Sequence, residues 1–154
     1  MAVISAKTAI LFRSCFLWSF GYMLVANPKK VTGHPLVVLI GQAMRLPELE
    51  IQKGDPLVGL LAICLITGGL SDIPLLAVEG SSYLTVNSVV VPIRLLIFFA
   101  VTGWCYLDYN PYLSNGLVFA YGFVEIVINF CIYVVVREEK NELVGQEVRK
   151  RHGE

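Results

Sequence analysis

The chain has 154 residues, of which 56% are hydrophobic and only 16% charged, and its twelve basic residues balance twelve acidic ones. With a mean hydropathy of +0.68, it is too apolar for an ordinary soluble domain. The composition predicts an integral membrane protein. It also argues against nucleic-acid binding, because no basic patch with interleaved aromatic residues is present.

The cysteines each lie in a separate apolar stretch, without a Cys-x-x-Cys pair or a histidine at ligand spacing. We interpret them as small buried apolar residues rather than disulfide partners or metal ligands, and we expect no cofactor. They are Cys15, Cys64, Cys105 and Cys131.

The first predicted span runs from Thr8 to Ala26. It is longer than the apolar region of a signal peptide, and no cleavage site precedes Asn27-Pro28, so we expect it to be retained. Arg13 lies about one turn inside this span. A long arginine side chain can extend to the membrane surface, so we expect Arg13 to do this rather than form a buried ion pair.

The stretch from Pro35 to Leu46 is apolar but has only 12 residues, about 18 Å as a helix, which is too short to cross a bilayer. Gln42 and Arg45 interrupt its apolar character. We predict a re-entrant or interfacial half-helix that closes the bundle as a structural wedge. A short fifth span from about Val31 to Ile51 is the alternative.

After a polar loop from Glu48 to Asp55, a second span is predicted from Pro56 towards Ala77. The pair Gly68-Gly69 predicts close helix packing or a kink. Asp72 lies near the end of this span. We expect it to cap the helix or mark its boundary rather than form a deeper ion pair.

A polar connection from Glu79 to Ser88 precedes a third span from Val89 to Leu107. Pro92 is expected in its first turn, where the missing N–H costs little. Arg94 lies about one turn inside. If consecutive spans are antiparallel, Arg94 and Asp72 lie at the same membrane face and can pair.

The fourth predicted span, from Gly116 to Val136, follows an aromatic-rich interfacial segment around residues 106–112. Its polar positions recur every fourth residue and therefore share one face of the helix. These positions are Tyr121, Glu125, Asn129 and Tyr133.

A carboxyl group facing lipid costs about 2.5 kcal/mol or more, so this face should point into protein or a wet cavity. We expect Glu125 to be neutral, or paired with Arg13 or Arg94, and to determine how the helices align.

Residues 137–154 are rich in both basic and acidic residues and are expected to form a solvated helical or disordered cytosolic tail, following a transmembrane bundle formed by residues 1–136. Basic residues near both ends place both termini in the cytosol if four spans cross the membrane. That arrangement leaves Lys29 and Lys30 on the opposite side, which five spans would reverse. The predicted fold is all-α: four transmembrane helices plus one short re-entrant or interfacial half-helix.

Several short motifs give the chain a family resemblance. They are Ser5-Ala6-Lys7-Thr8-Ala9, Leu39-Ile40-Gly41-Gln42-Ala43-Met44, Ser71-Asp72, Tyr106-Leu107-Asp108-Tyr109-Asn110-Pro111, Leu117-Val118-Phe119 and Arg137-Glu138-Glu139-Lys140-Asn141-Glu142. With these stretches the chain resembles the fungal family named for increased loss of mitochondrial DNA. The resemblance implies a small polytopic protein of the endoplasmic reticulum membrane whose loss disturbs mitochondrial genome maintenance indirectly. No catalytic or ligand residues come with this family.

The sequence contains no HExxH, GxSxG, P-loop or GxGxxG motif, so we expect no enzyme. An enzyme of lipid metabolism is a further alternative. We expect a non-catalytic accessory or scaffold subunit that binds a larger integral protein of the endoplasmic reticulum membrane and contacts membrane lipids, in a complex that handles or transfers lipid. The main alternative is potassium conduction along the Glu125 face and the half-helix.

Overall fold

The computed structural model describes residues 5–52, 54–77, 82–107 and 112–152, and within these residues it contains helices and no strand. The predicted all-α class is confirmed. The helices are α1 (Ala6–Ala26), α2 (Pro28–Thr32), α3 (Pro35–Ala43), α4 (Pro56–Ser71), α5 (Ile73–Ala77), α6 (Ser82–Leu107) and α7 (Gly116–His152).

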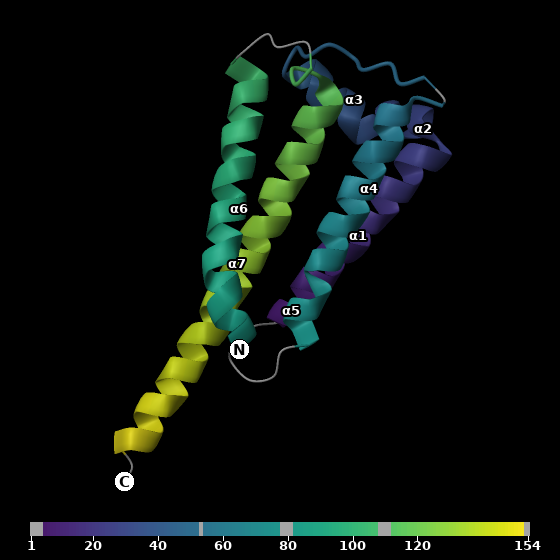
Figure 1. Ribbon diagram of the computed structural model, residues 1–154. Coiled ribbons are helices and arrows are strands. Elements are labelled where there is room, and N and C mark those ends of the chain that lie inside the picture. The colour runs from purple at the N-terminus through teal and green to yellow at the C-terminus, as the bar shows by residue number, and fades with distance from the viewer. Residues whose placement is uncertain (1–4, 53, 78–81, 108–111, 153–154) are drawn as a thin grey trace.

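The four long helices run up and down and form two pairs, α1 with α4 and α6 with α7 (Figure 1). Helix α7 joins the pairs by also packing against α1, while α3 packs against α7 near its start. The start of α1 and the end of α7 lie at the same end of the bundle. The two short helices α2 and α3, and the extended segment after them, lie at the other end.

Among the residues that the structure describes, three helices are long and apolar enough to cross a membrane: Ala6–Ala26, Ser82–Leu107 and the Gly116–Lys150 part of α7. The second predicted span is shorter than expected. It divides at Asp72 into α4, which has 16 residues and reaches about 24 Å, and α5. Pro74 explains the break, because it has no N–H to donate to the carbonyl of Leu70; the Asp72 N–H donates to that carbonyl instead.

The start of the third span was predicted seven residues too late. Helix α6 begins at Ser82, so Pro92 lies inside the helix and not in its first turn. The helix accommodates the polar residues before Val89, since their side chains bond to its own carbonyls: Asn87 Nδ2 donates to the carbonyl of Tyr83, and Ser88 Oγ to that of Thr85. Residues 79–81 of the predicted polar connection lie outside the described residues.

The predicted half-helix is short, as expected, with nine residues in α3. It ends just before Arg45, whose φ of 55° lies in the left-handed region and cannot continue a helix. The stretch from Val31 to Ile51 is not one continuous helix. Gly41 of α3 lies against Gly116 of α7 so closely that a Cβ on either would come within 3.2–3.3 Å of the other Cα.

Helices α1 and α4 also meet at small residues. A Cβ on Gly69 would lie 2.8 Å from Nε1 of Trp18 and 3.2 Å from the carbonyl oxygen of Ser14, whereas a Cβ on the neighbouring Gly68 would meet nothing within 4 Å. Trp18 Nε1 donates to the carbonyl of Ile66 at 3.2 Å. The close packing predicted from the glycine pair therefore involves Gly69 alone.

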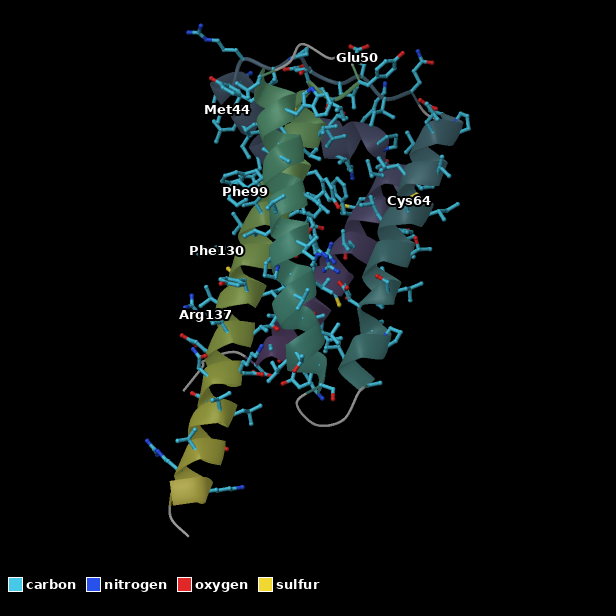
Figure 2. All side chains as sticks on the ribbon, turned by 60° about the vertical axis from the view of Figure 1, so that its left-hand side comes forward. Met44, Glu50, Cys64, Phe99, Phe130 and Arg137 are labelled. Atoms are coloured by element: carbon cyan, nitrogen blue, oxygen red, sulfur yellow. The ribbon has the colours of Figure 1, made fainter. Side chains whose placement is uncertain are left out.

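The prediction that the cysteines are buried was wrong for three of the four. Cys105 is buried, but Cys15, Cys64 and Cys131 lie on the outer surface, and all four are free thiols. Figure 2 shows Cys64 on this outer surface, as it does Phe99 and Phe130. The outside of a membrane bundle is itself apolar, so an apolar neighbourhood in the sequence does not indicate burial between helices.

Candidate functional site

Four charged side chains from different parts of the chain meet in the middle of the bundle. They are Arg13 of α1, Asp72 between α4 and α5, Arg94 of α6 and Glu125 of α7. Three of them are buried, with relative solvent exposures of 5% for Arg13, 3% for Asp72 and 0% for Glu125. The side chain of Arg94 is 22% exposed. We call these four residues the charge network.

The Arg13 guanidinium is the centre of the charge network. Its Nε and Nη2 donate to the two carboxylate oxygens of Glu125 at 2.9 and 3.1 Å, and its Nη1 donates to Asp72 Oδ2 at 2.6 Å. Asp72 also accepts two bonds from Arg94, at 2.9 and 3.3 Å. These are paired, charge-assisted bonds in the geometry that arginine forms with carboxylates.

Two neutral side chains on α7 complete the coordination of Glu125. Asn129 Nδ2 donates to Oε2 of Glu125 and also to its backbone carbonyl, both at 2.7 Å, and the Tyr121 hydroxyl donates to Oε1 at 3.2 Å. Tyr121 is held in place by stacking on Phe20, with ring centroids 5.4 Å apart. Asn129 Oδ1 is buried and accepts no hydrogen bond from the described residues.

The charges of the network cancel, since two guanidinium groups face two carboxylates. Arg13 lies about 10 Å from the start of α1, inside the predicted span, where an unpaired charge is costly. Burial of a charge is tolerated when it is paired and its remaining hydrogen-bonding groups are satisfied. The Glu125 carboxylate meets this condition fully.

Two sequence predictions about these residues were wrong. Arg13 does not extend to the membrane surface, because Asp72 and Glu125 both come within its reach and compensate its loss of water. Asp72 is the C-cap residue of α4, as expected, but it is also buried in ion pairs. The predicted pairs of Glu125 with Arg13 and of Asp72 with Arg94 are confirmed.

The other predicted residues lie elsewhere. Tyr133, on the same face of α7, packs partly buried against an apolar cluster that includes Val91 and Ile132. Gln42 and Arg45 lie exposed around the end of α3, and their role as partner contacts stays a prediction.

A second polar cluster was missed by the sequence analysis. Glu139 accepts from the Ala6 backbone N–H at 2.7 Å and from the Tyr83 hydroxyl at 2.8 Å, and Lys7 lies 5.0 Å from the centre of the Tyr83 ring. The Glu139 carboxylate thus caps the start of α1 from another helix. A signal was available: Glu139 follows Glu125 by fourteen residues, about four turns, and so falls on nearly the same face.

Comparison with known proteins places the chain in a family. The family described as increased loss of mitochondrial DNA protein 1 matches residues 4–112 and 108–146. The chain belongs to this family. Protein ILM1 of Saccharomyces cerevisiae is 36% identical over 141 residues, covering 90% of this chain and 68% of its own length. Protein ilm1 of Schizosaccharomyces pombe is 31% identical over 156 residues, covering 96% of this chain and 93% of its own.

No solved structure matches the chain. Within this family member, the buried charges bind one another, so the arrangement is suited to holding four helices in one relative position. No group of three or more histidine, cysteine, aspartate or glutamate side chains in the described residues could hold a metal ion.

Proposed function

We propose that this chain is a non-catalytic accessory or scaffold subunit of a larger complex in the endoplasmic reticulum membrane, one that handles or transfers lipid. The observation that carries the proposal is the closed charge network. Each buried carboxylate is bound to arginine, and Glu125 also accepts bonds from Asn129 and Tyr121. We therefore assign the charge network to the fold rather than to substrate binding.

The same observation weighs against the alternative of potassium conduction. An ion pathway needs an acidic or carbonyl oxygen that is open to the passing ion. The oxygens of Glu125 are instead occupied by Arg13 and two neutral donors, and the side chain has no exposed surface. An effect of Glu125→Gln on conductance by reconstituted protein would revive this alternative.

A four-span topology with both termini in the cytosol fits this role. Helix α4 with α5 would form the fourth crossing beside the three longer helices, and α2 and α3 would lie at the lumenal surface. Its support is that α1 starts and α7 ends at the same end of the bundle (Figure 1). Glycosylation-acceptor tags test it: a tag in the 48–55 segment should be modified, and tags at either terminus should not.

Helix α7 offers a surface for the partner. It continues past the bundle towards His152, and Val144 and Val148 are exposed on this charged extension. The effect on mitochondrial DNA would then be indirect, through the membrane lipid that the complex supplies.

The direct test is purification of the tagged chain in mild detergent, followed by mass spectrometry. We expect one large membrane protein at fixed stoichiometry. Changing both Val144→Glu and Val148→Glu should weaken this association, whereas Gln146→Glu, at an exposed polar position on the same helix, should not. A stable monomer that co-purifies with no other protein would contradict the proposal.

A further inference from the structure

A cavity of about 740 Å³ lies between α2 and the extended segment that joins α3 to α4. This volume falls within the range of about 300–1,000 Å³ typical of small-molecule sites. Charged and polar side chains line it from both sides: Lys29 and Thr32 from α2, and Glu48, Glu50 and Gln52 from the extended segment. The cavity shares no residue with the charge network.

The extended segment is fastened to the bundle by alternate residues. Leu49 and Ile51 pack against an apolar cluster formed by Leu17, Leu24, Val31, Leu65 and Leu117. The carbonyl of Pro47 also accepts from the Gly116 N–H at 3.1 Å. In an extended chain successive side chains point to opposite sides, so the alternate residues Glu48, Glu50 and Gln52 are turned away from that cluster. Figure 2 shows Glu50 at this end of the molecule.

The charged groups around the cavity have no partner within the described residues. Lys29, Glu48 and Glu50 are all exposed, and the charged group of each side chain forms no ion pair or hydrogen bond within the described residues. One positive group and two negative groups therefore line the same open space. Such a site suits a ligand that carries both an anionic and a cationic group, and its excess negative charge disfavours a purely anionic ligand.

The position of the cavity points to the membrane as the source of that ligand. Helix α1 ends at Ala26 and α4 begins at Pro56, so the cavity lies at the level where the spans end. Exposed aromatic residues surround the same end of the bundle, as is typical of the headgroup region: Tyr22, Trp104, Tyr106 and Tyr112.

We propose that this cavity binds the headgroup of a zwitterionic phospholipid, with the phosphate at Lys29 and the ammonium group at Glu48 and Glu50. Ethanolamine is favoured over choline, because a primary ammonium donates charge-assisted hydrogen bonds to carboxylates. Choline is typically held by aromatic rings, and none lies among the described residues that line the cavity. The site does not depend on the accessory role.

Native mass spectrometry of the delipidated full chain in detergent tests the site, with phosphatidylethanolamine, phosphatidylcholine and phosphatidylglycerol added separately. Phosphatidylethanolamine should be retained most and phosphatidylglycerol least. Lys29→Gln and the pair Glu48→Gln with Glu50→Gln should each weaken retention of phosphatidylethanolamine about tenfold, the effect expected for loss of a charged hydrogen bond. Lys30→Gln is the matched control, since the adjacent lysine is also exposed but does not line the cavity.

Soluble phosphoethanolamine distinguishes the two sources of this headgroup. If it fails to displace the phospholipid, the membrane ligand is supported. If it displaces the phospholipid at comparable concentration, the choice of a membrane lipid is overturned in favour of a soluble phosphoamine. Equal retention of phosphatidylglycerol, or an equal loss with Lys30→Gln, would overturn the site itself. Neither result would alter which proteins co-purify, so the proposed accessory role is tested separately.

Discussion

The charge network and the cavity beside Lys29 both bring opposite charges together, but they use them differently. In the charge network every carboxylate is bound by an arginine and the total charge is zero. Arg13, Asp72 and Glu125 are buried, and Arg94 is partly buried. Around the cavity, Lys29, Glu48 and Glu50 are exposed and unpaired within the described chain. The same residue chemistry thus stabilises the fold where water is absent, and stays available for a ligand where water is present.

The largest effect should follow from removing Arg13. Arg13→Met leaves the buried Glu125 carboxylate without a cationic partner, whereas Asp72 keeps Arg94, and we expect a loss of about 3–5 kcal/mol in the free energy of unfolding. Unfolding of the purified chain in mixed micelles with increasing dodecyl sulfate measures it. Arg45→Met, at an exposed arginine, should change little.

The double variant Arg13→Met with Glu125→Leu sharpens this result. It removes both charges of one pair and leaves the bond between Asp72 and Arg94, so it should be more stable than the sum of the two single changes predicts. Strict additivity, or an Arg13→Met variant within 1 kcal/mol of the natural chain, about the scale of an exposed ion pair, would show that the network is not energetically coupled.

The packing that places Arg13 beside Asp72 gives an intermediate effect. Gly69→Ala puts a Cβ 2.8 Å from Trp18 Nε1 and 3.2 Å from the Ser14 carbonyl oxygen, so the Trp18 indole or helix α1 must shift, at a cost of about 1–3 kcal/mol. Gly68→Ala, with open space around it, should be neutral or slightly stabilising, because alanine has the higher helix propensity. The same unfolding assay compares the two; equal stabilities would contradict the close contact.

Asn129→Leu should cost less, about 1 kcal/mol. The change removes a hydrogen bond to the Glu125 carboxylate but also removes Oδ1, a buried acceptor without a partner in the described residues, and these effects partly offset each other. Asn129→Asp adds a third carboxylate to the neutral network and should be clearly more destabilising. The order of these two variants in the unfolding assay is the measurement, and the reverse order would be evidence against a neutral network.

The smallest effect on stability is expected at the cavity. Lys29→Gln should change the free energy of unfolding by no more than about 0.5 kcal/mol, because the side chain is exposed and unpaired in the described structure. Measured without added lipid, a loss comparable to that of Arg13→Met would mean that Lys29 serves the fold.

The sequence anticipated a good part of the charge network. The four-residue period in α7 identified Tyr121, Glu125 and Asn129, and the order of the spans suggested that Asp72 meets Arg94. It did not predict the ion pairs of Arg13, because whether an arginine extends to the surface depends on how many carboxylates come within its reach. Its carboxylate partners, Asp72 and Glu125, lie 59 and 112 residues away in the chain, so no local sequence pattern reveals them.

Helix boundaries were harder to predict from the sequence for a related reason. Residues 82–88 have the composition of a polar connection, yet they are helical. Their polar groups find partners in the folded chain: Tyr83 donates to Glu139, 56 positions away, and Asn87 and Ser88 bond to carbonyls of α6. Likewise, the exposed positions of Cys15, Cys64 and Cys131 follow from which faces of the helices meet, and an apolar segment is compatible with either face.

Sequence alone determined the helical class, the membrane character and the family, since these follow from the length of apolar segments and from residue identity along the chain. Only the tertiary structure decided which charged side chains are paired within the fold and which are exposed and unpaired. That distinction depends on the spatial arrangement of groups from several helices, because the cost of an ionised side chain is set by its neighbours and its access to water.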